Sequence, residues 1–167
     1  ASGSAWALLI VTSAPNSFAF ANRASATSST MIDPGVSSLA VMTAASPLHR
    51  SFVEAAARHP QRIAVVEPGI GSITYRDLDR LSDRLRDRLV ASGVRPGDRV
   101  GLYMRKSIDA VAAIYGTLKS GAAYVPVDPG APPARNAYIM HNCAVRVALI
   151  EAEFEDAFRR EFAAYGD

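Results

Sequence analysis

Two charged side chains in this 167-residue chain, Lys119 and Asp128, have the chemistry that an active site would need. An ammonium group can hold a phosphate, and a carboxylate can bind a metal ion or accept a proton. They flank a short apolar run, Ala123–Val127, which is typical of a strand buried on both faces. One cation and one anion beside a strand are common in purely structural settings. We therefore interpret both residues as scaffold and assign no catalytic, cofactor-binding or metal-binding residue.

Cysteine and histidine do not suggest a second kind of site. Cys143 is the only cysteine, so the sequence allows neither an internal disulfide nor a cysteine metal cluster. It precedes a predicted strand, and we expect a buried, unreactive thiol. His49, His59 and His141 do not have the spacing of metal ligands. The sequence therefore gives no support to a metal site.

Composition argues against several classes of partner. The net charge of +2, with 49% hydrophobic and 20% charged residues, is that of an ordinary globular domain. Arginines alternate with aspartates along the chain, so we expect neither nucleic acid nor an anionic membrane as a partner. Gly69 and Gly71 form a Gly-x-Gly within a turn, whereas a phosphate loop must open a helix after a longer strand. We expect a cytoplasmic protein.

The first 45 residues differ from the remainder of the chain. They are rich in Ala, Ser and Thr, poor in charge, and without a sustained helical or strand period. The apolar run Ala5–Val11 is too short to cross a bilayer. A signal peptide is an alternative, but no basic residue precedes the run. We expect a disordered or mis-assigned leader over 1–45, with Met31 or Met42 as possible true starts, and a folded region over 46–167.

From Ser46 onward, strands alternate with helices. The sequence predicts an α/β fold with a mainly parallel sheet and helices on its faces. We expect helices near residues 46–59, 74–92, 107–120, 132–142 and 151–165. Ser107 is expected to cap the helix over 107–120, and Gly121 can take a left-handed conformation at its end. We expect strands near Ile63–Val66, Ser72–Thr74, Val100–Met104, Ala123–Val127 and Val145–Ile150. The strand Ala123–Val127 is expected at the centre of the sheet.

The predicted helix over 74–92 has the clearest signals. Thr74 and Asp77 have capping-box spacing, and Gly93 follows its end. Four leucines recur every three or four residues, and the opposite face alternates Arg with Asp. We interpret that charged face as solvated.

Two segments resemble motifs of one enzyme family. The run Leu118-Lys119-Ser120-Gly121-Ala122-Ala123-Tyr124-Val125-Pro126-Val127-Asp128 resembles the second core motif of adenylate-forming enzymes, with Ser120 where Ala is usual. The run Ile73-Thr74-Tyr75-Arg76-Asp77-Leu78 resembles their first core motif, Leu-Thr-Tyr-x-Glu-Leu. Order and separation also match. The family comprises acyl-CoA ligases and the adenylation domains of nonribosomal peptide synthetases.

The resemblance implies an enzyme that activates a carboxylic acid. Such enzymes use ATP and Mg²⁺ to form an acyl-adenylate, which CoA or a carrier-protein thiol then captures. The resemblance covers about 46–162, the opening part of the large N-terminal subdomain. It implies that the ATP-binding loop, the acids that bind magnesium and ribose, and the catalytic lysine would lie beyond Asp167. We therefore expect an N-terminal fragment that is inactive alone, in which Gly121, Tyr124, Pro126 and Asp128 are structural positions.

Two other classes of function differ in what they require of the sequence. A dinucleotide-binding protein would need Gly-x-Gly-x-x-Gly between a strand and a helix, and this pattern is missing. A non-catalytic interaction module that binds a partner through an open sheet edge stays open as an alternative. The Tyr-Val-Pro-Val-Asp form favours amino-acid adenylation over fatty acyl-CoA ligation, but the sequence does not identify the acid.

Overall fold

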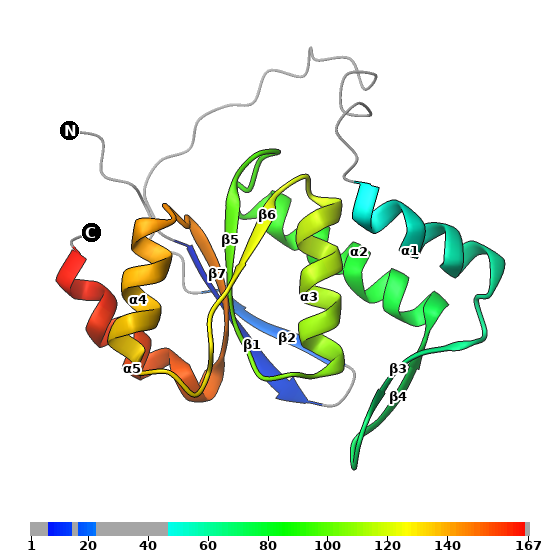
Figure 1. Cartoon of the computed structure of the whole chain (residues 1–167), viewed down its shortest axis with the longest axis horizontal. Helices are drawn as coiled ribbons and strands as arrows, with labels where there is room; N and C mark the ends of the chain where they lie inside the picture. The colour runs from blue at the N-terminus through cyan, green and yellow to red at the C-terminus, as the bar shows by residue number, and fades with distance from the viewer. Residues whose placement is uncertain (1–6, 15–16, 23–46, 166–167) are drawn as a thin grey trace.

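The computed structural model describes residues 7–14, 17–22 and 47–165, which form an α/β structure around a five-stranded sheet. The sheet has the strand order β2-β1-β7-β5-β6 (Figure 1). The strands are β1 (Ala7–Ala14), β2 (Ser17–Asn22), β3 (Ile63–Glu67), β4 (Gly71–Thr74), β5 (Arg99–Tyr103), β6 (Ala123–Pro126) and β7 (Val147–Glu151). The helices are α1 (Pro47–Arg58), α2 (Tyr75–Ala91), α3 (Ile108–Lys119), α4 (Pro133–Asn142) and α5 (Ala152–Phe162), followed by a short 3-10 helix (Ala163–Tyr165).

The parallel core consists of β1, β7, β5 and β6, whereas β2 joins antiparallel to β1. Figure 1 shows α2 and α3 on one side of the sheet and α4 and α5 on the other. The buried residues divide accordingly. One cluster, which includes Leu85, Leu89 and Leu149, joins α2 to the sheet, and another, which includes Met140, Ile150 and Phe158, joins α4 and α5 to it. The predicted layered α/β architecture is confirmed.

Local helix signals were also correct. The backbone N–H of Asp77 donates to the Thr74 hydroxyl at 3.2 Å, and that hydroxyl donates to the Asp77 carboxylate at 2.7 Å. Ser107 caps α3 through the N–H of Ala110. Gly121 has a φ of 80°, so it takes the left-handed conformation that a residue with a Cβ rarely adopts.

The motif strand β6 is not central, and the expectation that it would be buried on both faces is wrong. It pairs with β5 alone and lies at an edge of the sheet. Three of its four residues are exposed, including Tyr124 at 37%. The physical reason is present in the sequence: Pro126 has no N–H to donate to a further strand, which suits an edge. Apolar composition alone does not distinguish a central strand from an edge strand.

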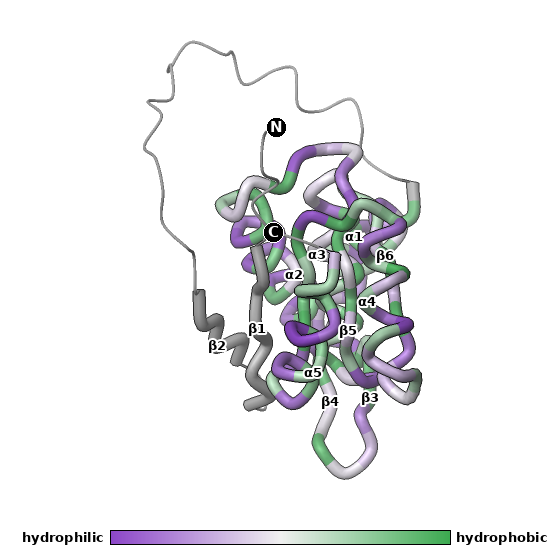
Figure 2. The backbone as a smooth tube through the Cα atoms, turned by 90° about the vertical axis from the view of Figure 1, so that its left-hand side faces the viewer, coloured by the Kyte–Doolittle hydropathy of each residue, from purple (hydrophilic) through white to green (hydrophobic). Residues whose placement is uncertain are grey.

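The strands Ile63–Val66 and Ser72–Thr74 are both present on either side of the predicted turn, but Ile63–Val66 does not belong to the main parallel sheet. It forms β3, which pairs with β4 in a separate antiparallel two-stranded sheet. Figure 2 shows this hairpin projecting from the remainder of the molecule. The turn predicted for residues 68–71 is present, with Gly69 at a φ of 78°. A short hairpin packs against helices instead of extending the parallel sheet.

The expectation that residues 1–45 lack strand structure is wrong for β1 and β2. Ile10 pairs with Ile150 in the parallel β1–β7 ladder, and Val11 pairs with Phe20 in the β1–β2 hairpin. The apolar run over residues 7–11 has the length and composition typical of a strand. Residues 23–46 lie outside the described part, so the proposed starts Met31 and Met42 are not addressed.

Candidate functional site

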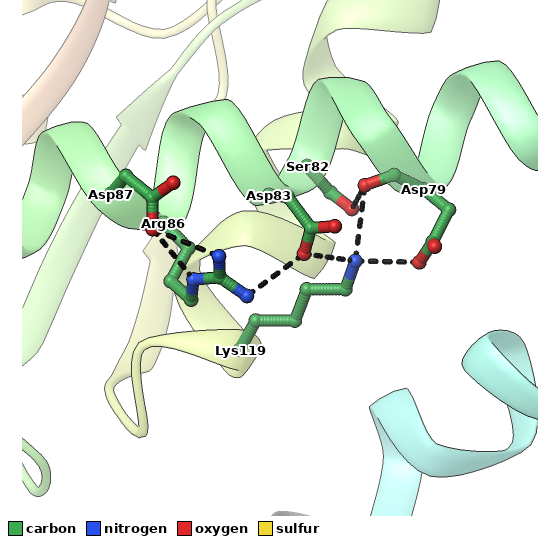
Figure 3. Close-up of polar contacts among 6 residues, drawn as sticks. All are labelled: Asp79, Ser82, Asp83, Arg86, Asp87 and Lys119. Atoms are coloured by element: carbon green, nitrogen blue, oxygen red, sulfur yellow. Dashed lines mark hydrogen bonds and ion pairs between the residues drawn. The ribbon is translucent and has the colours of Figure 1, made fainter.

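Lys119, the cation of the sequence motif, is held at the junction of α2 and α3 (Figure 3). Its Nζ donates to Asp79 Oδ1 at 2.6 Å, to Asp83 Oδ1 at 2.9 Å and to the Asp79 carbonyl at 3.1 Å. The Lys119 side chain is only 6% exposed. An ammonium group has three donors, and all three have acceptors here. Lys119 is therefore a structural cation that ties two helices together.

A second layer around Lys119 comes from α1. The Nζ of Lys119 lies 5.6 Å from the ring centroid of Phe52 in α1. Phe52 in turn stacks on Tyr115 with ring centroids 4.0 Å apart. Burial lowers the pKa of His49, and the positive charge of Lys119 lowers it further. The Nδ1 of His49 is buried without a hydrogen-bond partner. This arrangement holds α1 against a fixed positive charge.

Asp128, the anion of the motif, organises a turn. Its Oδ1 accepts from the backbone N–H of Gly130 at 2.9 Å, and its backbone carbonyl accepts from the Asn136 side chain at 2.9 Å. An aspartate that bonds to the amide two residues on is typical of a turn. Asp128 and Lys119 have separate partners and separate roles, so the two residues do not form one charged site.

The other side chains singled out from the sequence are also dispersed. Cys143 caps the end of α4 and is half-buried, so the expectation of a fully buried thiol was only partly correct. His141 stacks on Tyr165 with ring centroids 4.6 Å apart, and His59 follows the end of α1. Among the described residues, no three histidine, cysteine, aspartate or glutamate side chains could together hold a metal ion.

The structure reveals one charged cluster that the sequence interpretation missed, at the carboxyl ends of β5 and β7. These neighbouring parallel strands lead to helices on opposite sides of the sheet, which is where open α/β sheets form ligand crevices. The Glu151 carboxylate accepts from the backbone N–H of Arg105 at 2.8 Å. The Arg105 guanidinium forms an ion pair with Glu153 and lies 5.2 Å from the Phe154 ring centroid. Arg105 and Glu151 both adjoin predicted strand ends, and that signal could have identified the cluster.

Electrostatics make this carboxyl-end cluster largely self-compensating. Burial raises the pKa of Glu151, and Glu153 raises it further, whereas the hydrogen bond from the Arg105 backbone lowers it. Tyr103, at the end of β5, is buried and stacks on Phe154 with ring centroids 4.7 Å apart. The Arg105 guanidinium thus has a carboxylate and an aromatic ring of the same chain as partners. This favours a structural role for Arg105 over a role in binding a ligand.

A further carboxylate, that of Glu67, joins the hairpin to the main body. The Glu67 side chain accepts from the backbone N–H of Ile108 at 2.8 Å, at the start of α3. Burial raises the pKa of nearby Asp109, and the negative charge of Glu67 contributes to the rise. The helix N-terminus that could have bound a phosphate is therefore already satisfied by Glu67 and Ser107.

Comparison with known proteins identifies the family. Residues 52–164 match the family described as AMP-binding enzyme. This segment is more than half of the chain, and the chain therefore belongs to the AMP-binding enzyme family. The resemblance drawn from the two sequence motifs is confirmed.

The curated relatives include several very long synthases. Isonitrile lipopeptide synthase of Mycobacterium tuberculosis is 41% identical over 114 residues, which are 66% of this chain and 4% of that protein. Bacitracin synthase 1 of Bacillus licheniformis is 36% identical over 114 residues, 68% of this chain and 2% of that protein. Malpibaldin synthetase of Mortierella alpina is 38% identical over 110 residues, which are 66% of this chain and 2% of that protein. The chain thus spans a few per cent of these relatives' lengths.

Solved structures agree on the fold. The nonribosomal peptide synthetase FmoA3 superposes with a TM-score of 0.61 at 37% identity, over 65% of this chain and 12% of that chain. The anthranilate CoA ligase AuaEII, solved with anthranoyl-AMP, superposes with a TM-score of 0.64 at 24% identity, over 67% of this chain and 22% of that chain. At that identity the second likeness supports the fold alone. None of the helices in the described part of this chain is long and apolar enough to span a membrane.

Proposed function

We propose that this chain forms the opening part of an enzyme that activates a carboxylic acid with ATP. The reaction would give an acyl-adenylate and pyrophosphate, and a thiol of CoA or a carrier protein would then capture the acyl group. The observation that carries this proposal is the family match over residues 52–164. The similar proteins that are named as peptide synthases or synthetases favour an amino acid over a fatty acid as the substrate.

The role we propose for these residues is support of the active site. Phosphoryl chemistry of this kind needs cations and a metal ion placed around the reacting phosphates. In the described residues, Lys119 is neutralised by Asp79 and Asp83, and Arg105 by Glu153. These residues do not fit ATP and its Mg²⁺. Their contribution would be the position and stability of the sheet.

Pyrophosphate exchange tests the first half of this proposal. The chain would be incubated with ATP, Mg²⁺, labelled pyrophosphate and a panel of amino, aryl and fatty acids. We expect no exchange above background, because the groups that lower the barrier by positioning and charge are not assembled. Acid-dependent exchange that disappears in Lys119→Ala would contradict the scaffold role.

A chimera tests the second half. Residues 52–164 would replace the matching segment of an adenylation domain from bacitracin synthase 1, with the unaltered domain as the reference. If the segment is scaffold, the chimera should retain exchange with the host domain's own amino acid and no other. A folded chimera that loses exchange, or that changes its acid, would contradict the proposed role.

A further inference from the structure

A cavity of about 430 Å³ lies between the β3–β4 hairpin and the first turns of α2. Its size falls within the usual range of binding pockets. Ser72, Ile73 and Thr74 contribute to it from β4, and Arg80, Leu81 and Arg84 contribute from α2. The hairpin extends away from the main body in Figures 1 and 2. Ser72, Arg80 and Arg84 line the cavity and are exposed, so it is open to solvent.

The cavity follows the open edge of β4. Ser72, Ile73 and Thr74 all line it although successive side chains of a strand point to opposite faces, so the cavity reaches the edge of β4. Ile63 of β3, which pairs with Thr74, borders the cavity from one face of the hairpin. Within the described part of the chain, β4 pairs with β3 and with no second strand. The other edge of β4 is therefore free to pair with an incoming strand.

Ser72 presents backbone groups at this edge. The N–H of Tyr75 donates to the carbonyl of Arg62 at 2.9 Å, so Tyr75 faces the chain that leads into β3. Backbone groups alternate in direction along an antiparallel strand. Ile73 therefore also faces β3, whereas Ser72 directs its N–H and its carbonyl towards the cavity.

The helix wall of the cavity is cationic. Arg80 and Arg84 are one helical turn apart and exposed. Neither arginine forms an ion pair with another of the described residues. Asp77 also borders the cavity, but its carboxylate accepts the Thr74 hydroxyl at 2.7 Å. Two guanidinium groups are thus available to bind carboxylates, with bidentate geometry open to each.

The floor of the cavity is apolar. Ile73 and Leu81 are 8% and 2% exposed, whereas Ile63 borders the cavity and is 52% exposed. An aliphatic side chain placed over Ile63 would remove apolar surface from water. An unpaired strand edge, an apolar floor and two arginines are therefore combined in one groove of the described structure.

We propose that this groove is a docking site for an extended, acidic segment of a partner polypeptide. The segment would add as a strand to β4 by bonding to Ser72, as in β-strand addition. Its carboxylates would bind Arg80 and Arg84, and an alternate aliphatic side chain would cover Ile63. Charge complementarity selects this occupant, because a basic or neutral strand would leave both arginines without partners. Because β4 has only four residues, the arginines supply much of the selectivity.

Binding of a defined peptide tests the proposal. The probe is fluorescein-labelled Val-Glu-Val-Glu-Val-Glu, measured by fluorescence anisotropy against the full chain, with Val-Lys-Val-Lys-Val-Lys as the charge-reversed control. We expect saturable binding of the acidic probe that weakens with added salt, as exposed ion pairs do. The absence of saturation at about 1 mM, or equal binding of the basic probe, would overturn the proposal.

Two independent sets of variants locate the site. Arg80→Glu with Arg84→Glu should weaken binding by about tenfold or more, whereas the charge-matched pair Arg135→Glu with Arg160→Glu should not. Ser72→Pro removes the outward donor and should weaken binding, whereas Ser72→Ala keeps that donor and should not. Unchanged binding in both test variants would overturn the proposal. Light scattering that shows a dimer disrupted by the Arg80/Arg84 variant would also overturn it, since the occupant would be a second copy.

Discussion

The Nζ of Lys119 lies 2.6 Å from Oδ1 of Asp79, and this ion pair connects α3 to α2 across 40 positions of sequence. Asp83 lies on the other side of the same ammonium at 2.9 Å. The lysine of the adenylation-family motif is thus used within this chain to hold two helices together.

Replacing Lys119 should therefore reduce stability. Lys119→Ala would leave two carboxylates close together without their cation. We expect a loss of about 1–3 kcal/mol in the free energy of unfolding, with the carboxylates' partial exposure limiting the effect. Urea unfolding followed by circular dichroism measures it. Lys106→Ala, in an exposed loop, is the control and should change the free energy of unfolding little. Equal losses in both variants would show that the ion pair does not stabilise the fold.

Stability should depend on pH through His49. Burial and Lys119 lower the pKa of His49 from 6.5, so the folded state binds fewer protons than the unfolded state between the lowered pKa and 6.5. Stability should accordingly rise with pH through that window, be complete above 6.5, and fall as the solution is acidified. Thermal unfolding from pH 5 to 8 measures the slope. His49→Gln should reduce this slope, and an identical slope in the variant and the unaltered protein would count against this role.

Gly116 should be intolerant of a side chain. A Cβ added there would lie 2.9 Å from the Cβ of Leu85, where α3 approaches α2. Gly116→Ala should lower the free energy of unfolding by about 1–3 kcal/mol, because the helices must separate. Gly130→Ala is the control, since its nearest neighbour would be 3.4 Å away. Leu85→Ala keeps the Cβ but removes Cγ and Cδ2, which would lie 3.0 and 2.9 Å from the added Cβ. In the double variant the losses should therefore be less than additive, and full additivity would exclude these contacts as the cause.

Removing β1 and β2 should destabilise the sheet. Ile10 pairs with Ile150 of β7, and β7 is buried over 147–150, so deletion of residues 1–22 would leave a long apolar strand edge unpaired. We expect a lower melting temperature and a tendency to aggregate, measured by calorimetry and light scattering. Deletion of residues 1–6 alone keeps both strands and is the control. An unchanged melting temperature after the longer deletion would contradict this role of β1 and β2 and favour the expected disordered or mis-assigned leader.

Short-range features were predictable from the sequence because their causes are local. Thr74 and Asp77 cap α2 as their spacing indicated, Ser107 caps α3, and Gly121 takes a left-handed conformation. Each depends on contacts or backbone angles within a few residues. The two motifs also identified the family, since they record residue types directly.

The tertiary structure alone decided which segments meet. The apolar pattern of β6 suited a central strand, but β6 pairs with β5 alone and lies at an edge. The strand β3 pairs with β4 in a separate hairpin and does not join the main sheet. Arg105 and Glu151 meet over 46 positions of sequence, which no local period reports. Strand order and ion-pair partners depend on contacts between distant segments, whereas periodicity describes only the faces of a single element. The sequence by itself therefore determined the family and most helices, and folding determined the neighbours of each charge.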